Sequence, residues 1–84
     1  MEIRLSNEAV RQYRRLNEPT LSRITEAIDK LELEPPEGDI IKLTDKENEY
    51  RLRIGGHRII FKKEGDYILV SRIIQRGQAY KDKE

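Results

Sequence analysis

The chain has 84 residues, of which 39% are charged, and a formal net charge of +1 at pH 7. It contains no cysteine and a single histidine, which excludes a disulfide framework, a thiolate metal site, a cysteine nucleophile and a multi-histidine zinc site. No run approaches the roughly 18 apolar residues of a membrane span, and no apolar signal segment follows the first residues. We expect one cytoplasmic domain over residues 1–84, with no membrane association, metal or other cofactor.

The small net charge hides an asymmetry between the two halves of the chain. Residues 1–49 carry 8 basic and 12 acidic side chains, whereas residues 50–84 carry 9 basic and 4 acidic ones. A basic half of this kind favours an anionic partner, with phosphate as the first candidate. The alternative is a chance block in a chain that is rich in charge.

A strand followed by a helix is predicted at the N-terminus. Ile3 and Leu5 alternate with charged residues, which is the period-two pattern of a half-buried strand. Ser6 or Asn7 then offers a side-chain oxygen for a helix N-cap. The apolar residues of this helix recur at three- and four-residue spacing and are Ala9, Val10, Tyr13 and Leu16. We expect the helix to end near Asn17.

A second helix is predicted to begin at Pro19, because proline suits the first helical turn. Its apolar stripe consists of Leu21, Ile24, Ile28 and Leu31. Pro35 and Pro36 stop the helix, because proline lacks a backbone donor and biases the preceding residue away from helix. Two short helices joined by a tight loop form an antiparallel hairpin.

Beyond Gly38 the pattern is typical of β-structure. Residues 50–54 alternate strictly between the two faces of a strand, and Gly55-Gly56 suits a two-residue hairpin loop. The strands expected in this part of the chain are residues 40–41, 50–54, 57–63 and 67–75. The element order predicts an α+β fold, in which an N-terminal strand and a helix hairpin precede an antiparallel β-meander and the helices cover one face.

Five arginines are expected to converge on the sheet face opposite the helices. Arg51 and Arg53 point to the same side of their strand because side chains alternate, and Arg58 begins the neighbouring strand. Arg72 and Arg76, four residues apart, share a face of the last strand if that strand is regular. The planar, permanently charged guanidinium suits binding of a phosphodiester and stabilisation of its charged transition state. The alternative is a solvated face whose ion pairs come from the helices.

His57 and Tyr80 are candidates to act beside the arginines. His57 titrates near neutrality, so it is either a general acid or base or a polar residue at the end of a strand. Tyr80, next to Lys81, either covers an edge of the core or stacks on a base and reaches a ribose. The sequence has no Gly-rich phosphate loop, nucleophile elbow or paired-carboxylate motif.

The second half of the chain resembles the C-terminal signature of RelE-type toxins. The matching residues are Tyr50-Arg51-Leu52-Arg53-Ile54-Gly55-Gly56-His57-Arg58-Ile59-Ile60-Phe61, then Ile68-Leu69-Val70-Ser71-Arg72-Ile73-Ile74-Gln75-Arg76, then Tyr80-Lys81. The order of elements in the first half also matches, so the resemblance covers nearly the whole chain. It points to the RelE/ParE toxin superfamily.

The resemblance implies the toxin of a type II toxin–antitoxin pair. RelE-like members cleave mRNA in the ribosomal A site without a metal, by attack of the ribose 2′-hydroxyl on the adjacent phosphate. The catalytic positions carried over from that branch are Arg51, Arg53, Arg58, Arg76 and Tyr80. We expect Arg72, His57 and Lys81 to bind RNA beside them. The implied partners are a cognate antitoxin, mRNA and the ribosome.

Two departures from the RelE pattern reduce the number of groups that can transfer protons. Arg53 stands where that branch commonly has a lysine, and arginine hardly deprotonates. Gln75 stands where the pattern often has a histidine.

Two alternatives to RNA cleavage remain at this stage. The ParE-like branch shares the fold and much of the central motif but inhibits DNA gyrase, and Arg76 together with Tyr80 favours the RelE side. The other alternative is an antitoxin-binding or RNA-binding module without catalysis.

Packing follows from the same patterns. We expect both helix stripes to pack on the sheet face that carries Leu52, Ile54, Ile59 and Phe61, with Arg51 and Arg53 pointing away from it. We expect the antitoxin to cover the opposite face with an acidic segment that also contacts three alternating apolar residues, Ile60, Val70 and Ile74.

Overall fold

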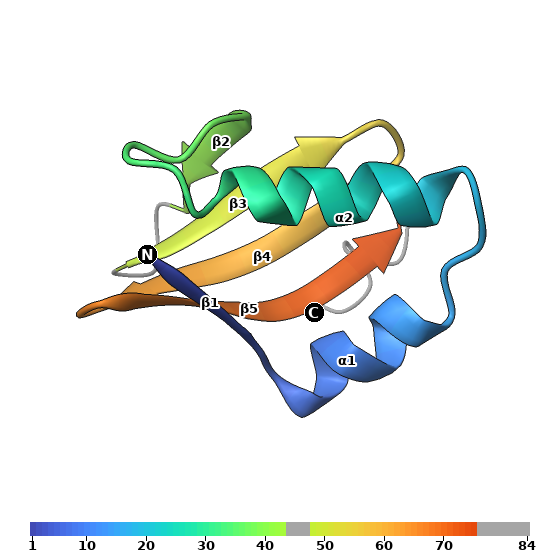
Figure 1. Cartoon of the computed structure of the whole chain (residues 1–84), viewed down its shortest axis with the longest axis horizontal. Helices are drawn as coiled ribbons and strands as arrows, with labels where there is room; N and C mark the ends of the chain where they lie inside the picture. The colour runs from blue at the N-terminus through green and yellow to red at the C-terminus, as the bar shows by residue number, and fades with distance from the viewer. Residues whose placement is uncertain (44–47, 76–84) are drawn as a thin grey trace.

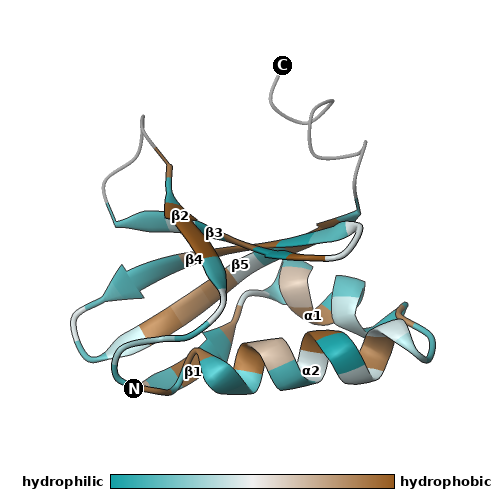
Figure 2. Cartoon of the chain, turned by 90° about the horizontal axis from the view of Figure 1, so that it is seen from above, coloured by the Kyte–Doolittle hydropathy of each residue, from teal (hydrophilic) through white to brown (hydrophobic). Residues whose placement is uncertain are grey.

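The computed structural model describes residues 1–43 and 48–75. Within them, five strands form one sheet in the order β1-β5-β4-β3-β2, and both helices lie against one of its faces (Figure 1, Figure 2). In chain order the elements are β1 (Glu2–Leu5), α1 (Asn7–Arg14), α2 (Thr20–Lys30), β2 (Asp39–Lys42), β3 (Glu49–Ile54), β4 (His57–Glu64) and β5 (Tyr67–Gln75). The predicted α+β class is confirmed. Neither helix is long and apolar enough to cross a membrane in this described part of the chain.

Ser6 lies at the boundary between β1 and α1 and caps the helix. Its side-chain oxygen accepts a hydrogen bond from the backbone N–H of Ala9 at 3.0 Å, which is the predicted N-cap. The same hydroxyl donates to the backbone oxygen of Ser71 in β5 at 2.7 Å. Ser6 therefore connects the start of α1 to the middle of β5.

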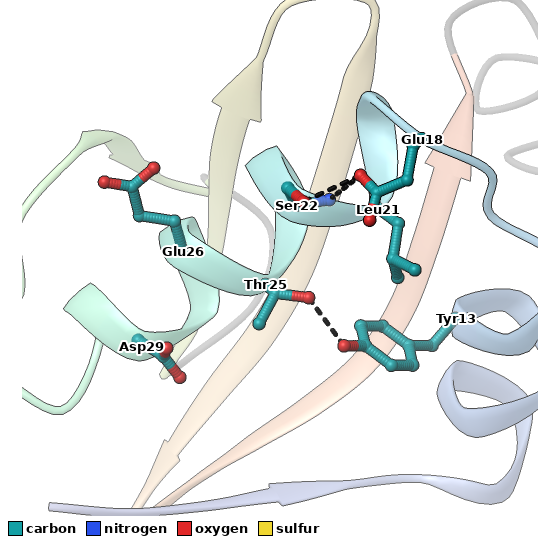
Figure 3. Close-up of a pocket in the computed structure, with 7 residues that line it drawn as sticks. All are labelled: Tyr13, Glu18, Leu21, Ser22, Thr25, Glu26 and Asp29. Carbon is teal, nitrogen blue, oxygen red and sulfur yellow. Dashed lines mark hydrogen bonds between the residues drawn. The ribbon is translucent and has the colours of Figure 1, made fainter.

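The two helices are joined through Tyr13 and Thr25, whose hydroxyl oxygens lie 2.5 Å apart (Figure 3). Figure 3 also shows Leu21 at the wall of a cavity beside this contact. The prediction that Val10 and Leu21 belong to the core is wrong, because both are half-buried and lie outside the core cluster. The Tyr13 side chain spans the space between the helices and leaves Leu21 at its rim.

The predicted meander runs antiparallel from β2 to β5. The Gly55-Gly56 turn joins β3 to β4, with Gly55 at φ +55°, a conformation that favours glycine. β1 pairs in parallel with β5, a contact that the pattern of residues did not predict. β5, the last of the described strands in the chain, therefore lies inside the sheet, between β1 and β4.

The core fills the space between the helices and one face of the sheet. Its buried members are Ala9, Ile24, Ile28, Leu31, Leu52, Ile59, Phe61, Ile68, Val70 and Ile73. Leu52 also fills the space beside Gly38, where an added Cβ would lie 2.6 Å from Leu52 Cδ1 and where φ is +136°. Glycine is therefore required at the entrance to β2.

Candidate functional site

Four of the five arginines predicted to converge lie on the sheet face opposite the helices, and we call this group the arginine face: Arg51, Arg53, Arg58 and Arg72. Arg53 pairs directly with Arg58 across β3 and β4. Arg51 pairs with Ile60, and Ile60 pairs with Arg72 on its other side. The arginines thus occupy neighbouring positions on three adjacent strands.

The direction of these side chains follows from the residues beside them. Leu52 and Ile59 are buried in the core on the helix side, so the flanking Arg51, Arg53 and Arg58 point to the other side. The remaining predicted residues of the site, Arg76, Tyr80 and Lys81, lie outside the described residues.

The arginine face concentrates like charge. A like-charged pair directly opposite each other on adjacent strands, such as Arg53 and Arg58, costs about 0.2–1 kcal/mol. Within residues 1–43 and 48–75, Nε of Arg51 is buried and has no hydrogen-bond partner. A buried donor of this kind is most favourable when an acceptor approaches it, and a phosphate oxygen is such an acceptor.

Helix α1 supplies an ion pair to this face. Arg72 Nε lies 3.7 Å from a carboxylate oxygen of Glu8 in the first turn of α1. The side chains of Arg72 and Glu8 remain 30% and 49% exposed. Such a pair contributes at most about 1 kcal/mol, so it positions Arg72 without neutralising the face.

A β-bulge in β5 decides which way Arg72 points. Phe61 of β4 pairs with Val70, whereas the preceding Ile60 pairs with Arg72, so Ser71 is an extra residue in β5. Ser71 Oγ donates to the backbone oxygen of Ile60 at 3.1 Å and holds the irregularity in place. The bulge allows Val70 to enter the core while Arg72 lies on the arginine face.

The bulge also corrects the expectation that three apolar residues alternate onto the basic face. Ile60 and Ile74 do lie there, since Ile60 pairs with Arg72 and Ile74 with Arg58. The placement of Val70 on this face is wrong, because two residues of β5 oppose one residue of β4 and the alternation changes phase.

Sequence reasoning missed the residues that support Arg72. β1 ends at Leu5, which pairs with Val70 of β5. Further along β5, the side-chain oxygen of Gln12 accepts a hydrogen bond from the backbone N–H of Ile73 at 2.6 Å. The signal for the bulge was present in the spacing of the buried residues Ile68, Val70 and Ile73, which changes from two to three around Ser71.

His57 does not join the arginines. It pairs with Ile54 and Gln75 and lines a cavity with Arg15 and Leu16 of the α1 end, on the helix side of the sheet. Its neighbour Arg58 points to the opposite side, as alternation requires. Within residues 1–43 and 48–75, no group of His, Asp and Glu side chains suited to a metal ion is present.

Comparison with known sequences places the chain in a family. Residues 3–80 match the family described as ParE toxin of type II toxin-antitoxin system, parDE. The chain belongs to this toxin family. The expected membership of the RelE/ParE superfamily is therefore confirmed. No curated protein gives a significant match to the toxin.

Several solved structures similar to the toxin carry the name RelE. The RelB-RelE antitoxin-toxin complex from Methanococcus jannaschii has a TM-score of 0.84 at 23% identity, covering 96% of this chain and 99% of that one. The archaeal RelE-RelB complex from Pyrococcus horikoshii OT3 has a TM-score of 0.76 at 27% identity, with 92% and 96% covered. The isolated E. coli RelE toxin has a TM-score of 0.77 at 16% identity, with 98% and 93% covered. The toxin therefore has the RelE fold.

Proposed function

We propose that the toxin is an endoribonuclease of the RelE-like type, which cleaves mRNA in the ribosomal A site without a metal. The observation that carries this proposal is the arginine face, where Arg53 and Arg58 are direct neighbours and Arg51 has a buried donor without a described acceptor. The guanidinium groups on this surface repel one another in the free protein, and a bound phosphodiester reduces that repulsion.

The proposed reaction is attack of the ribose 2′-oxygen on the adjacent phosphorus. A bond forms between the 2′-oxygen and phosphorus, and the bond from phosphorus to the 5′-oxygen breaks. The 2′-hydroxyl loses a proton, the 5′-oxygen gains one, and a 2′,3′-cyclic phosphate remains. Negative charge grows on the non-bridging oxygens during the attack, and preorganised guanidinium donors lower the barrier. In this proposal Arg51, Arg53 and Arg58 supply those donors, and Arg76 acts at the scissile phosphate.

Proton transfer is assigned to Tyr80. Arginine hardly deprotonates, and His57 lies on the helix side of the sheet. The variant Tyr80→Phe separates the two roles of the tyrosine, because stacking on a base survives loss of the hydroxyl whereas proton transfer does not. Full activity in this variant would mean that the toxin acts through positioning and charge alone.

A cognate antitoxin is the proposed protein partner. The relatives from Methanococcus jannaschii and Pyrococcus horikoshii OT3 were solved as complexes of antitoxin and toxin. An acidic segment on the arginine face would relieve the repulsion between Arg53 and Arg58 and exclude RNA from the same surface. Binding to the folded toxin alone would also raise its apparent stability.

A second candidate function is inhibition of DNA gyrase. The family match favours it, since the matched family is described as a ParE toxin. In that case the arginine face contacts gyrase or its DNA, and cleavage chemistry is absent.

Two assays run in parallel separate the candidates. One measures cleavage of mRNA on programmed ribosomes with mapping of the new 5′ ends, and the other measures supercoiling by gyrase. Ribosome-dependent cleavage that is lost in Arg58→Ala supports the proposal. Inhibition of supercoiling with intact mRNA would replace it by the gyrase-directed function, and inactivity in both assays would leave a binding module without catalysis.

A further inference from the structure

An exposed isoleucine of β2 lies on the arginine face. β2 pairs with β3 at the edge of the sheet, where Ile41 stands directly opposite Arg51 (Figure 1). Residues directly opposite each other on neighbouring strands point to the same side of a sheet. Arg51 points away from the helices, so Ile41 does too. The preceding residue, Ile40, stands opposite Leu52 and packs against the core on the helix side. The two isoleucines of β2 are therefore divided between the two faces.

Ile41 is the most exposed large hydrophobic residue on the described arginine face. Its side chain is 44% exposed, whereas Ile74 on the same face is 5% exposed and Ile60 is half-buried. The other exposed large hydrophobic residues in the described part of the chain, Met1 and Leu33, line a cavity beside the loop that follows α2. A single exposed apolar side chain is ordinary on a protein surface. Its neighbours decide whether it belongs to a binding surface.

Apolar and cationic side chains alternate across four adjacent strands at this position. Ile41 pairs with Arg51, Arg51 pairs with Ile60, and Ile60 pairs with Arg72. Adjacent strands lie about 4.8 Å apart, so Ile41 and Ile60 flank Arg51 closely. Nε of Arg51 is buried, and it has no hydrogen-bond partner among the described residues. Apolar neighbours that exclude water strengthen the attraction between a guanidinium and an anion.

The two ends of β2 differ in charge on this face. Asp39 stands opposite Arg53, and both side chains are exposed. A carboxylate at that position repels the phosphates of RNA, whereas Ile41 carries no charge. An RNA strand that crosses this edge of the sheet is therefore favoured over Ile41 and disfavoured over Asp39.

We propose that Ile41 packs against the face of the nucleobase next to the phosphate that Arg51 binds. An unpaired nucleotide presents the same two features as this surface, a charged phosphate beside an apolar base face. The inference rests on the proposed function in taking RNA as the ligand of the arginine face, and it adds a contact to a base where the arginines contact phosphates. In a duplex the base faces are stacked and out of reach. Ile41 therefore selects single-stranded over double-stranded RNA without reading the base edges.

Ile41→Ala tests the contact without changing the net charge. The probe is a labelled single-stranded 2′-O-methyl RNA, which cannot be cleaved by attack of a 2′-hydroxyl, and fluorescence anisotropy measures its affinity. We expect roughly 3- to 10-fold weaker binding by Ile41→Ala, and binding within about 2-fold of wild type by the conservative Ile41→Val. The slope of log K against log salt should stay constant, because every phosphate contact remains. The matched control Leu33→Ala truncates a side chain that is 45% exposed and lies away from the arginines, and it should bind within about 2-fold of wild type.

A single abasic nucleotide, moved along the probe, identifies the base that Ile41 contacts. At one position the missing base should weaken binding by the wild type and cause little further weakening in Ile41→Ala, since each change removes the same contact. A double-stranded probe of the same sequence should bind equally to wild type and Ile41→Ala. Urea unfolding of each variant checks that the fold is intact.

The outcomes separate this inference from the proposed activity. If the wild type binds the probe, the inference is overturned by unchanged affinity in Ile41→Ala, by equal losses in Ile41→Ala and Leu33→Ala, or by purely additive effects of the variant and every abasic position. Light scattering tests a second copy as the occupant, and a wild-type dimer that becomes a monomer in Ile41→Ala would also overturn it. Coupling between Ile41 and one base in a toxin that cuts no mRNA on ribosomes would refute the cleavage and leave the base contact standing. A wild type that binds no RNA would overturn both.

Discussion

On the sheet face opposite the helices, basic residues have different neighbours in the two halves of the face. In the half near the turn between β4 and β5, Arg4 Nε donates to Glu2 at 3.1 Å, and the guanidinium lies 4.0 Å from the centroid of the Tyr67 ring. The hydrogen bond from Arg4 to Glu2 raises the pKa of Arg4. Lys62 in the same half stands opposite Glu49 of β3. Basic residues in this half therefore have acidic or aromatic neighbours.

The other half of the face contains the arginine face. Arg53 stands opposite Arg58, and Arg51 stands between Ile41 and Ile60. What distinguishes this half is that two arginines, Arg53 and Arg58, stand directly opposite each other. Like charges in that arrangement are destabilising, which indicates a surface shaped for an anionic ligand.

The largest expected effect is on the sheet that supports both halves. Leu52 lies between Arg51 and Arg53 in the sequence, is 2% exposed and packs in the core. Leu52→Ala should lower the free energy of unfolding by about 2–5 kcal/mol, because it removes a buried side chain and leaves a cavity. Urea unfolding measures the change. The control Ile41→Ala removes a side chain that is 44% exposed, and a similar loss there would contradict the assigned core.

The next prediction tests whether function is confined to one half. Arg58→Ala should lower the single-turnover rate of mRNA cleavage roughly 100- to 1,000-fold, as expected for the loss of a preorganised donor to a developing oxyanion. The free energy of unfolding should change by less than about 1 kcal/mol, because the loss of repulsion from Arg53 offsets the loss of the interactions that Arg58 makes.

Arg4→Ala is the matched control for Arg58→Ala in the other half. It removes the same guanidinium from the same sheet face and should leave cleavage within about 2-fold, since its partners are local. Equal losses in both variants would show that the face acts through its total charge, and the distinction between its halves would be lost.

Salt dependence sharpens the same comparison for binding. Each phosphate contact made to single-stranded RNA contributes about 0.7 to the slope of log K against log salt. Arg51→Ala should therefore reduce the magnitude of this slope by about 0.7, whereas Arg4→Ala should leave it unchanged. Fluorescence anisotropy with a short labelled RNA measures both slopes. An unchanged slope of log K against log salt in Arg51→Ala would show that Arg51 does not contact an RNA phosphate.

Local patterns were sufficient to predict most of the fold. Ser6 marked the start of α1, Gly55-Gly56 marked the β3–β4 turn, and strict alternation around Leu52 gave the two faces of β3 correctly. These features depend on neighbouring residues, for which sequence spacing is the relevant physics. The same alternation placed Arg51, Arg53 and Arg58 together.

The features that were missed depend on residues far apart in the chain. The parallel pairing of β1 with β5 joins residues more than 60 positions apart, such as Ile3 and Ile68. The bulge at Ser71 is stabilised by Ser6, and the adjacent edge of β5 by Gln12, so neither contact follows from the spacing within β5. His57 was named as a candidate site residue because it flanks Arg58 in the sequence, although alternation along a strand places the two side chains on opposite faces.

The smallest expected effect concerns the ion pair between Glu8 of α1 and Arg72 on the arginine face. Glu8→Gln removes the charge that lies 3.7 Å from Arg72 Nε, and it keeps a side-chain carbonyl that can still accept from Gln12, which bonds to Glu8 at 3.2 Å. Because the pair is partly exposed, the free energy of unfolding should fall by less than about 1 kcal/mol, and RNA affinity should rise roughly 2- to 5-fold as Arg72 becomes available to phosphate. The matched control is Glu26→Gln in α2, which makes the same change of net charge on an exposed helix position away from the sheet. Anisotropy on the same labelled RNA compares the two variants. An equal rise in RNA affinity in both variants would show that the change in net charge explains the effect and that Arg72 is not part of the binding surface. A rise confined to Glu8→Gln would show that the binding surface extends across β5 to the first turn of α1.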